Sequence, residues 1–294
     1  MTQPNRPAID TTLTAFLRSL SGANKSEATI TAYRTDLSQF AHFLIETNCT
    51  IVTPADVRRG DIAEYLSHLG ERGMSGKTRA RKLAAIREYF RFLESEGLVT
   101  ANPTLGVATP KKEHSGRTAL RSDEYTKLLS LAGANPRDYA ILQVFLQTGI
   151  RVSELCALTR EDIDFEQRLL RISSGKGMKT RTIELEKRGI QAIKSYLAVR
   201  PESLSNALFL NYQGERLSTR GVQKMLVKYL KASGITKKIS PHSLRHTFAT
   251  YKAERGVSPY VLREWLGHAR LDTTQIYVHM ARENSKKAME ATSL

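Results

Sequence analysis

Residues 240–279 read SPHSLRHTFATYKAERGVSPYVLREWLGHARLDTTQIYVH and carry histidine, arginine and tyrosine side chains in one compact stretch. Ser240 followed by Pro241 predicts a helix start, because serine caps the first backbone N–H groups and proline fits the first helical position. Ser258 and Pro259 repeat this signal. The stretch therefore predicts two successive helices, each with a defined beginning.

Four polar side chains of this stretch are placed by the expected helices. His242 and Arg245 are three residues apart, so they share one face of the first helix. The second helix is expected to end near Gly267, which puts His268 just past its end. Tyr277 follows nine positions later, on a short expected helix. We interpret this set as half of a site that handles a phosphodiester.

The composition indicates a soluble globular protein that binds a polyanion. The 294 residues are enough for two ordinary domains, each with its own core. The formal net charge is +16, from 45 Lys and Arg against 29 Asp and Glu. This excess is spread along the chain, whereas a membrane-binding protein more often concentrates its charge on one amphipathic helix or tail. Nucleic acid is therefore the expected partner.

Other classes of protein are disfavoured by what the sequence lacks. Cys49 and Cys156 are its only cysteines, too few for a disulfide framework or a structural zinc site. Cysteine, histidine and carboxylate residues do not cluster with metal-ligand spacing, so we expect no metal and no other cofactor. No apolar run reaches the ~20 residues needed to span a bilayer. A cytoplasmic protein without membrane contact is expected.

Residues 1–101 are predicted to form a helical domain of four helices, because apolar residues recur there at helical spacing. Ser75 caps the fourth helix, whose N-terminal half is strongly basic. Its basic residues are Lys77, Arg79, Arg81, Lys82 and Arg87. Such a run is often only a solvated charged face. Because no acidic residue lies between positions 77 and 87, we predict a surface that contacts DNA phosphates.

Residues 102–116 read as a linker, since the apolar period stops and prolines, glycines and charges take over. Residues 117–294 are predicted to form a second, mainly helical domain. Its clearest strand signal is LLRISSGKGMKTRTIEL, in which residues 169–173 and 181–185 are extended runs joined through a glycine-rich turn. The predicted fold class is mostly α with a small antiparallel β-sheet.

Three more residues extend the candidate site. Arg151 follows a glycine-containing helix end in QTGIRVSELCAL, where the backbone break points its guanidinium away from the preceding helix. Glu154, one turn further on, is positioned to hold Arg151 through a charge-assisted hydrogen bond. Lys176 lies at the tip of the predicted hairpin. Each residue alone would be read as an ordinary surface or turn residue. Their order and spacing together indicate a site.

These segments resemble the tyrosine recombinases, also called the phage integrase family, and most closely their bacterial Xer-type members. TGIRVSELCAL is similar to the family's first arginine box, GKGMKTR to its lysine-bearing turn, and HSLRHTFAT and LGHARLDTTQIYVH to its remaining motifs. The resemblance covers almost the whole chain. It implies the catalytic residues Arg151, Lys176, His242, Arg245, His268 and the nucleophile Tyr277, with Glu154 in support.

Physical chemistry agrees with these implied roles. Displacement at a phosphodiester needs positive charge, because anionic oxygens repel the nucleophile. Arg151 and Arg245 each offer paired N–H groups to the non-bridging oxygens, and His268 adds a third donor. Tyr277 suits the nucleophile, since a phenolate ester conserves the energy of the broken bond for later religation without ATP.

Two proton transfers complete the expected reaction. Lys176 is the candidate acid for the departing 5′ oxygen, and His242 the candidate acceptor of the tyrosine proton. Lys179 lies three residues after Lys176, and a different hairpin register would exchange their roles. The expected product is a 3′-phosphotyrosyl bond with a free 5′ hydroxyl.

The resemblance also implies an assembly. The two domains are expected to clamp duplex DNA, and four subunits, as a homotetramer or heterotetramer, to join two specific recombination sites, with or without an activating protein. Chromosome dimer resolution, cointegrate resolution and mobile-element integration all use this core. A type IB topoisomerase that relaxes DNA and a catalytically silent DNA-binding regulator are the alternative functions.

Overall fold

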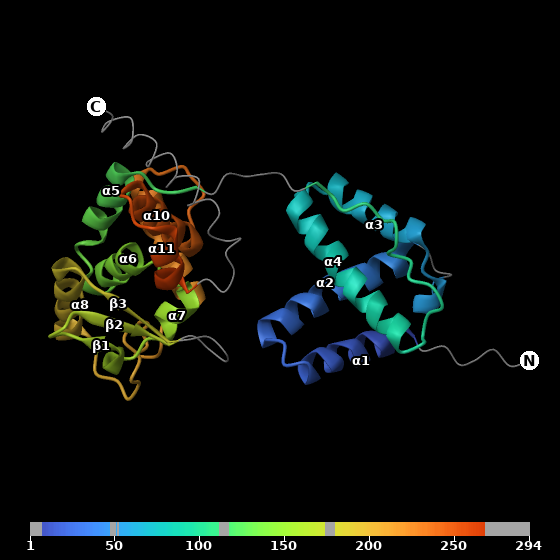
Figure 1. The fold of residues 1–294 in the computed structure, drawn as a ribbon, viewed down its shortest axis with the longest axis horizontal. Coiled ribbons are helices and arrows are strands. Elements are labelled where there is room, and N and C mark those ends of the chain that lie inside the picture. The colour runs from blue at the N-terminus through green and yellow to red at the C-terminus, as the bar shows by residue number, and fades with distance from the viewer. Residues whose placement is uncertain (1–7, 48–50, 52, 112–117, 174–179, 268–294) are drawn as a thin grey trace, which may run out of the picture. The chain divides into compact units, whose positions relative to one another are not determined.

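The computed structural model describes residues 8–47, 51, 53–111, 118–173 and 180–267. It divides into two compact units, Met1–Ser115 and Gly116–Leu294 (Figure 1). Each unit has its own apolar core. None of the described helices combines the length and the apolarity needed to cross a bilayer.

The first unit contains four α-helices within its described residues, as the sequence predicts. They are α1 (Ile9–Gly22), α2 (Glu27–Thr47), α3 (Arg59–Glu71) and α4 (Gly76–Ser95), with a short 3-10 helix at Pro54–Asp56. The helix α4 packs against each of the other three. Its buried side carries Leu83, Ile86 and Phe90, each with no exposed surface. The predicted cap is present, since the Ser75 hydroxyl accepts a hydrogen bond from the backbone N–H of Thr78.

The second unit is mainly helical and carries a small sheet. Its helices are α5 (Ser122–Ala132), α6 (Pro136–Thr148), α7 (Val152–Ala157), α8 (Lys187–Val199), α9 (Thr219–Ser233), α10 (Pro241–Glu254) and α11 (Pro259–Leu266). A 3-10 turn lies at Arg160–Asp162. The helix α6 is the centre of the core, because it packs against both α8 and α10 (Figure 1).

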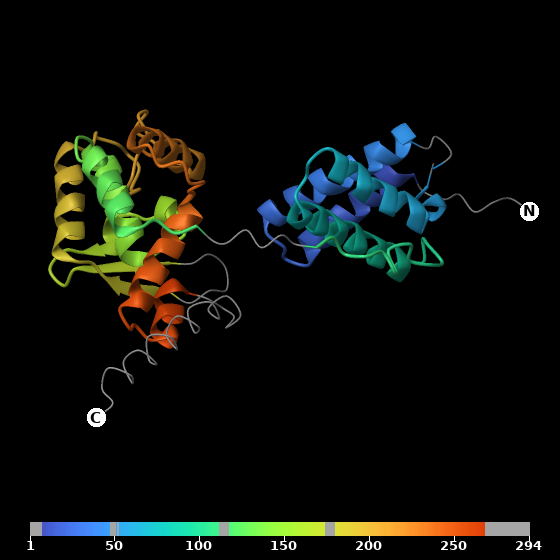
Figure 2. The same ribbon diagram turned by 90° about the horizontal axis from the view of Figure 1, so that it is seen from above.

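The sheet consists of three antiparallel strands in the order β1, β2, β3 within the described residues. They are β1 (Ile163–Asp164), β2 (Leu169–Ile172) and β3 (Arg181–Glu184). The predicted pairing of β2 with β3 is confirmed, with Leu170 opposite Ile183. The two-residue strand β1 was not predicted, because so short a segment carries no period of its own. Figure 2 shows the sheet from a second direction.

The helices α10 and α11 begin where the sequence predicts. The Ser240 hydroxyl accepts from the backbone N–H of Ser243 at 3.3 Å, and the Ser258 hydroxyl accepts from that of Tyr260 at 3.3 Å. The helix α11 ends at Gly267, which has φ +60° and so adopts the left-handed conformation that glycine tolerates best. This fixed end places the carbonyls of the last turn of α11 at the candidate site.

Candidate active site

Arg151 and Glu154 form a compact pair at the start of α7. Arg151 is the residue that precedes the helix, and Glu154 is its third residue. The Arg151 backbone N–H donates to Glu154 Oε2 at 2.9 Å, and its Nη1 donates to Oε1 at 2.7 Å. Glu154 therefore caps the helix and holds the arginine side chain at the same time.

Three arginines from three different elements bind consecutive carbonyls at the end of α11. The three carbonyls belong to Trp265, Leu266 and Gly267, and their partners are Arg181 Nε at 2.7 Å, Arg245 Nη2 at 2.6 Å and Arg151 Nη2 at 2.9 Å respectively. The last carbonyls of a helix have no partner within it and carry the negative end of its dipole. The end of α11 therefore gathers guanidinium groups at one place.

The guanidinium of Arg245 is fixed by burial and by two backbone carbonyls. Its side chain is buried, and its Nη1 donates to the carbonyl of Gly149 at 2.9 Å. Together with the bond to Leu266, this ties α10 both to the turn before α7 and to the end of α11. A guanidinium has five N–H donors in a rigid plane, so these two bonds set the direction of the others.

Two glycines permit this close approach. Gly149 ends α6 with φ +58°, and a Cβ there would lie 2.5 Å from a ring carbon of Phe248. At Gly267, a Cβ would lie 3.1 Å from Nη1 of Arg181. Both residues need the left-handed backbone region and the absence of a side chain. The arginine cluster therefore depends on the glycines that precede and follow its elements.

Arg181, on β3, is a member of the cluster that sequence reasoning missed. Its Nη2 donates to Glu154 Oε2 at 2.8 Å and its Nη1 to Oε1 at 3.1 Å. The residue is buried, on the same side of the strand as Ile183. An arginine in the inward register of an apolar strand is the signal that would have identified it, because buried charges are normally paired.

The charge of Glu154 is stabilised by its partners. Burial alone would raise the pKa of this carboxyl, yet hydrogen bonds from Arg181 and from the backbone and side chain of Arg151 lower it to about 2. Glu154 is thus ionised at neutral pH. Arg151, Arg181 and Arg245 together exceed its single negative charge, so the cluster favours a bound anion such as a phosphate.

The other candidate residues are only partly described. His242 lies exposed in the first turn of α10, three residues before Arg245. Lys176, with its alternative Lys179, lies outside the described residues, and so do His268 and Tyr277. The structure therefore brings Arg151, Glu154 and Arg245 together. Gly267, the residue directly before His268 in the chain, contributes a carbonyl to the same cluster.

The basic residues of α4 do not form one uniform exposed face. Lys77 and Arg81 are exposed, but the side chain of Lys82 is only 4% exposed and its Nζ donates to Asp36 Oδ1 at 2.9 Å. Arg81 pairs with the same carboxylate. Lys82 therefore departs from the predicted phosphate-contacting surface. The balancing acid absent from residues 77–87 is supplied by α2.

The two remaining basic residues of α4 are half-buried. Arg87 donates from Nη2 to the carbonyl of Val107 at 2.6 Å and from Nη1 to the hydroxyl of Thr109 at 3.0 Å. Arg79 packs against Gly70 of α3, since a Cβ at that glycine would lie 2.9 Å from its Nη1. Lys77 and Arg81 are thus the exposed members of the predicted surface.

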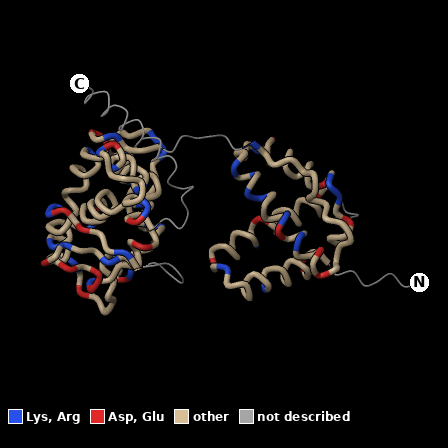
Figure 3. The backbone as a smooth tube through the Cα atoms, viewed as in Figure 1, with Lys and Arg blue, Asp and Glu red and all other residues tan. Residues whose placement is uncertain are grey.

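A second basic surface lies on α9 and was also missed. Its exposed residues are Arg220, Lys224, Lys228 and Lys231. Their spacing of three or four residues puts them on one face, and the segment Thr219–Ser233 contains no acidic residue. The sequence pattern is visible without the structure. Figure 3 shows that Lys and Arg are spread over both units.

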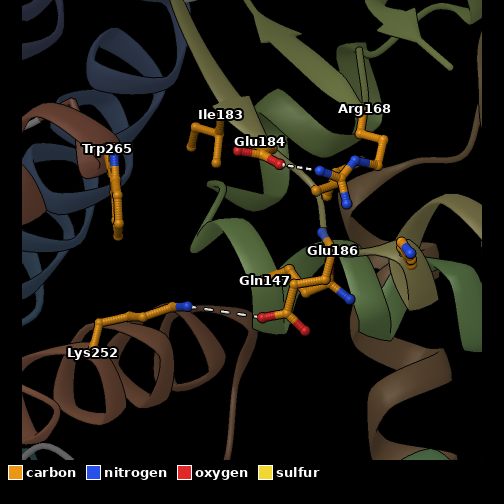
Figure 4. Close-up of a pocket in the computed structure, with 9 residues that line it drawn as sticks. Gln147, Arg168, Ile183, Glu184, Glu186, Lys252 and Trp265 are labelled. Carbon is orange, nitrogen blue, oxygen red and sulfur yellow. Dashed lines mark hydrogen bonds and ion pairs between the residues drawn. The ribbon is translucent and has the colours of Figure 1, made fainter. Parts of the chain in front are cut away.

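A pocket of about 550 Å³ lies between β3, α8 and α10 and is lined by Gln147, Arg168, Glu184, Lys252 and Trp265 among others (Figure 4). Four of its five charged lining residues are paired, since Arg168 binds Glu184 at 2.7 Å and Lys252 lies 3.9 Å from Glu186. Paired charges do not favour an anion. We therefore assign the candidate phosphate site to the arginine cluster and not to this pocket.

Family models match most of the chain. The model described as "Phage integrase family" matches residues 118–284, and the model described as "Phage integrase, N-terminal SAM-like domain" matches residues 13–97. The matched segments contain all the candidate catalytic residues and the whole of α4.

Similar proteins include tyrosine recombinases of bacteria. The tyrosine recombinase XerC of Pelotomaculum thermopropionicum is 37% identical over 281 residues, which cover 90% of this chain and 91% of that protein. The tyrosine recombinase XerD of Listeria innocua is 35% identical over 267 residues, or 87% of this chain and 89% of that protein.

Solved structures share the fold. The crystal structure of XerA recombinase covers 95% of this chain and 98% of its own, with 30% identity and a TM-score of 0.56. The Tn1549 transposon integrase, solved in complex with transposon right end DNA, covers 98% of this chain and 100% of its own, with 20% identity and a TM-score of 0.79.

Proposed function

This chain belongs to the phage integrase family, as a Xer-type tyrosine recombinase and so a site-specific DNA recombinase, and from that premise we propose that it cleaves and rejoins duplex DNA through a 3′-phosphotyrosyl intermediate. The observation that carries this mechanism is the pair Arg151 and Arg245, held on adjacent carbonyls at the end of α11. Two fixed guanidiniums suit the two non-bridging oxygens of one phosphate.

In the proposed cleavage step, the phenol oxygen of Tyr277 attacks the scissile phosphorus and the bond to the 5′ oxygen breaks. His242 accepts the phenol proton, and Lys176 donates a proton to the departing 5′ oxygen. Arg151 and Arg245, with His268, stabilise the charge that develops on the phosphate oxygens. The reverse reaction with a 5′ hydroxyl of the partner strand completes strand exchange without an external energy source.

We propose that both units bind the DNA. The first unit, with a DNA-binding domain at residues 1–101, would contact phosphates through the exposed Lys77 and Arg81 of α4. The linker 102–116 would connect it to the catalytic domain, residues 117–294, where the basic face of α9 adds further phosphate contacts. The Tn1549 integrase, which shares the fold, was solved with DNA, and this supports duplex DNA as the partner.

The proposed assembly is a tetramer of identical or paired recombinases on two sites. Chromosome dimer resolution, cointegrate resolution and mobile-element integration would all use this catalytic core, with or without an activating protein. The location of the bound sequence in the source genome distinguishes these roles.

The test begins with selection of the bound sequence from a random duplex library at a fixed salt concentration, confirmed by footprinting. Two copies of the selected site are then placed on one supercoiled plasmid. We expect deletion or inversion of the intervening DNA, and no reaction on a plasmid without sites. Relaxation of both plasmids without strand exchange would instead favour a topoisomerase. Binding without any covalent adduct would favour a DNA-binding regulator.

A further inference from the structure

Arg181 is buried on β3 and contacts both the Glu154 carboxylate and the carbonyl of Trp265. We propose that Arg181 is a positioning residue, which holds Glu154 and the end of α11 so that Arg151 keeps its direction and its charge toward the scissile phosphate. This inference rests on the proposed function, because it assumes that Arg151 binds that phosphate.

The carboxylate of Glu154 is held at both of its oxygens. Arg181 binds both oxygens of Glu154, at 3.1 Å and 2.8 Å, in the two-pronged arrangement that a guanidinium allows. Arg151 binds the same oxygens through its side chain, at 2.7 Å, and its backbone N–H, at 2.9 Å. These contacts fix the plane of the carboxylate. They therefore also fix the orientation of the Arg151 side chain that it binds.

Arg181 also balances the charge of Glu154. The side chains of Arg181 and Glu154 are 8% and 7% exposed, whereas that of Arg151 is 34% exposed. Arg181 thus neutralises the carboxylate from the buried side. Without Arg181, the negative charge of Glu154 would act mainly on Arg151, at 2.7 Å, and would weaken the attraction of this arginine for a phosphate.

Arg181 also binds the end of α11. The Nε group of Arg181 binds the carbonyl of Trp265, and the next two carbonyls bind Arg245 and Arg151. Arg181 therefore holds the same turn that positions both arginines. A lysine has one ammonium group and cannot bridge both Glu154 oxygens and the Trp265 carbonyl in this planar way.

Packing alone does not explain an arginine at this position. The neighbouring inward residue of β3 is Ile183, which is 5% exposed. Replacing a buried ion pair by well-packed apolar side chains is often neutral or stabilising, because ion desolvation is costly. Apolar residues at both positions 154 and 181 would serve the core equally well, so this buried pair is better explained by the site beside it.

The experiment uses the full chain and a nicked suicide duplex built on the sequence that the wild-type protein selects. Arg181→Met, Glu154→Gln and the double variant are compared by the single-turnover rate of covalent adduct formation at saturating DNA. We expect Arg181→Met to lower this rate about 10- to 100-fold while the Kd for the duplex changes less than about threefold. In the Glu154→Gln background, the same change should cost clearly less, because the carboxylate is gone.

Two further variants separate positioning from stability. Arg168→Met removes a half-buried arginine, directly before β2, that pairs with Glu184 of β3, and it should leave the rate unchanged. Arg181→Lys keeps the charge, yet should remain slower than the wild type. Thermal unfolding establishes that each variant is folded at the assay temperature.

The outcomes are distinct. An unchanged rate in folded Arg181→Met, a wild-type rate in Arg181→Lys, or strictly additive effects with Glu154→Gln would overturn the role of Arg181. Failure of both Arg181 variants to fold would also contradict it, because Arg181 would then act through stability. If the wild-type protein itself forms no adduct with the selected duplex, the proposed function fails instead.

Discussion

The two units use the same arrangement of charges for different ends. In each, a buried carboxylate lies between one buried and one more exposed basic residue. In the second unit these are Glu154, Arg181 and Arg151. In the first unit they are Asp36, Lys82 and Arg81, and the side chain of Arg81 is 54% exposed.

The two clusters differ in the further contacts that their residues make. Arg151 also donates to the carbonyl of Gly267, beside the Leu266 carbonyl that holds Arg245, so two arginines converge on one place. Asp36 instead joins α2 to α4, with partners 45 and 46 residues away in the chain. A basic cluster thus becomes an anion site when the backbone fixes several guanidiniums together. Charge density by itself is not enough.

The largest effect is expected from breaking the buried pair of the first unit. Asp36→Ala leaves Lys82 buried without this carboxylate, and loss of one partner of a buried pair costs about 3–5 kcal/mol. Urea unfolding of the full chain, followed by circular dichroism, measures the loss. The control is Glu46→Ala, which removes an exposed partner of His42 and should change stability by less than about 1 kcal/mol. Equal effects of the two changes would contradict a stabilising role for Asp36.

The next largest effect is expected at the convergent arginines. Arg245→Lys loses the planar contacts to the carbonyls of Gly149 and Leu266 and one paired donor for the phosphate. We expect the single-turnover rate of adduct formation to fall by about 10²–10³-fold. Arg255→Lys, at the exposed end of the same helix, is the matched control. A wild-type rate in Arg245→Lys would show that fixed guanidinium geometry does not matter.

The contribution of the Glu154 carboxylate to stability is expected to depend on pH. The pKa of Glu154 is lowered from 4.5 to about 2 in the folded protein, so its ionised form stabilises the fold above pH 4.5. This contribution, about 3 kcal/mol, is lost as the pH falls toward 2. Glu154→Gln should not show that loss. Urea unfolding of both proteins between pH 2 and 6 measures it, and parallel curves would refute it.

The smallest effect is expected on the exposed face of α4. Lys77→Ala should weaken binding of the selected duplex slightly and reduce the slope of log Kd against log salt by about 1, because one phosphate contact is lost. Lys25→Ala, which removes an exposed lysine between α1 and α2, serves as the control and should leave the slope unchanged. A slope that Lys77→Ala also leaves unchanged would place the DNA elsewhere on this unit.

Sequence alone predicted the features that local chemistry determines. The starts of α10 and α11 depend on Ser240 and Ser258, whose hydroxyls bind backbone groups two or three residues away. The contact of Arg151 with Glu154 spans three residues and was predicted for the same reason. Apolar periodicity was sufficient for the four helices of the first unit, and two extended runs joined by a glycine-rich turn were sufficient for the pairing of β2 with β3.

The missed features depend on partners distant in the chain. Arg181 lies 27 residues from Glu154 and 84 from Trp265, so no local pattern pairs them. Lys82 was placed on an exposed face because its partner Asp36 belongs to another helix. The carbonyl contacts at the end of α11 were also unpredictable. Every residue has a backbone carbonyl, so the sequence does not show which of them an arginine binds.

The most direct measurement identifies the residue that becomes joined to DNA. The full chain is incubated with the nicked suicide duplex, the adduct is digested, and mass spectrometry locates the modified residue. We expect a 3′-phosphate on Tyr277, and no adduct with Tyr277→Phe. Modification of a different residue, or an undiminished adduct in Tyr277→Phe, would contradict the mechanism in which the arginines at the end of α11 prepare the phosphate for this tyrosine.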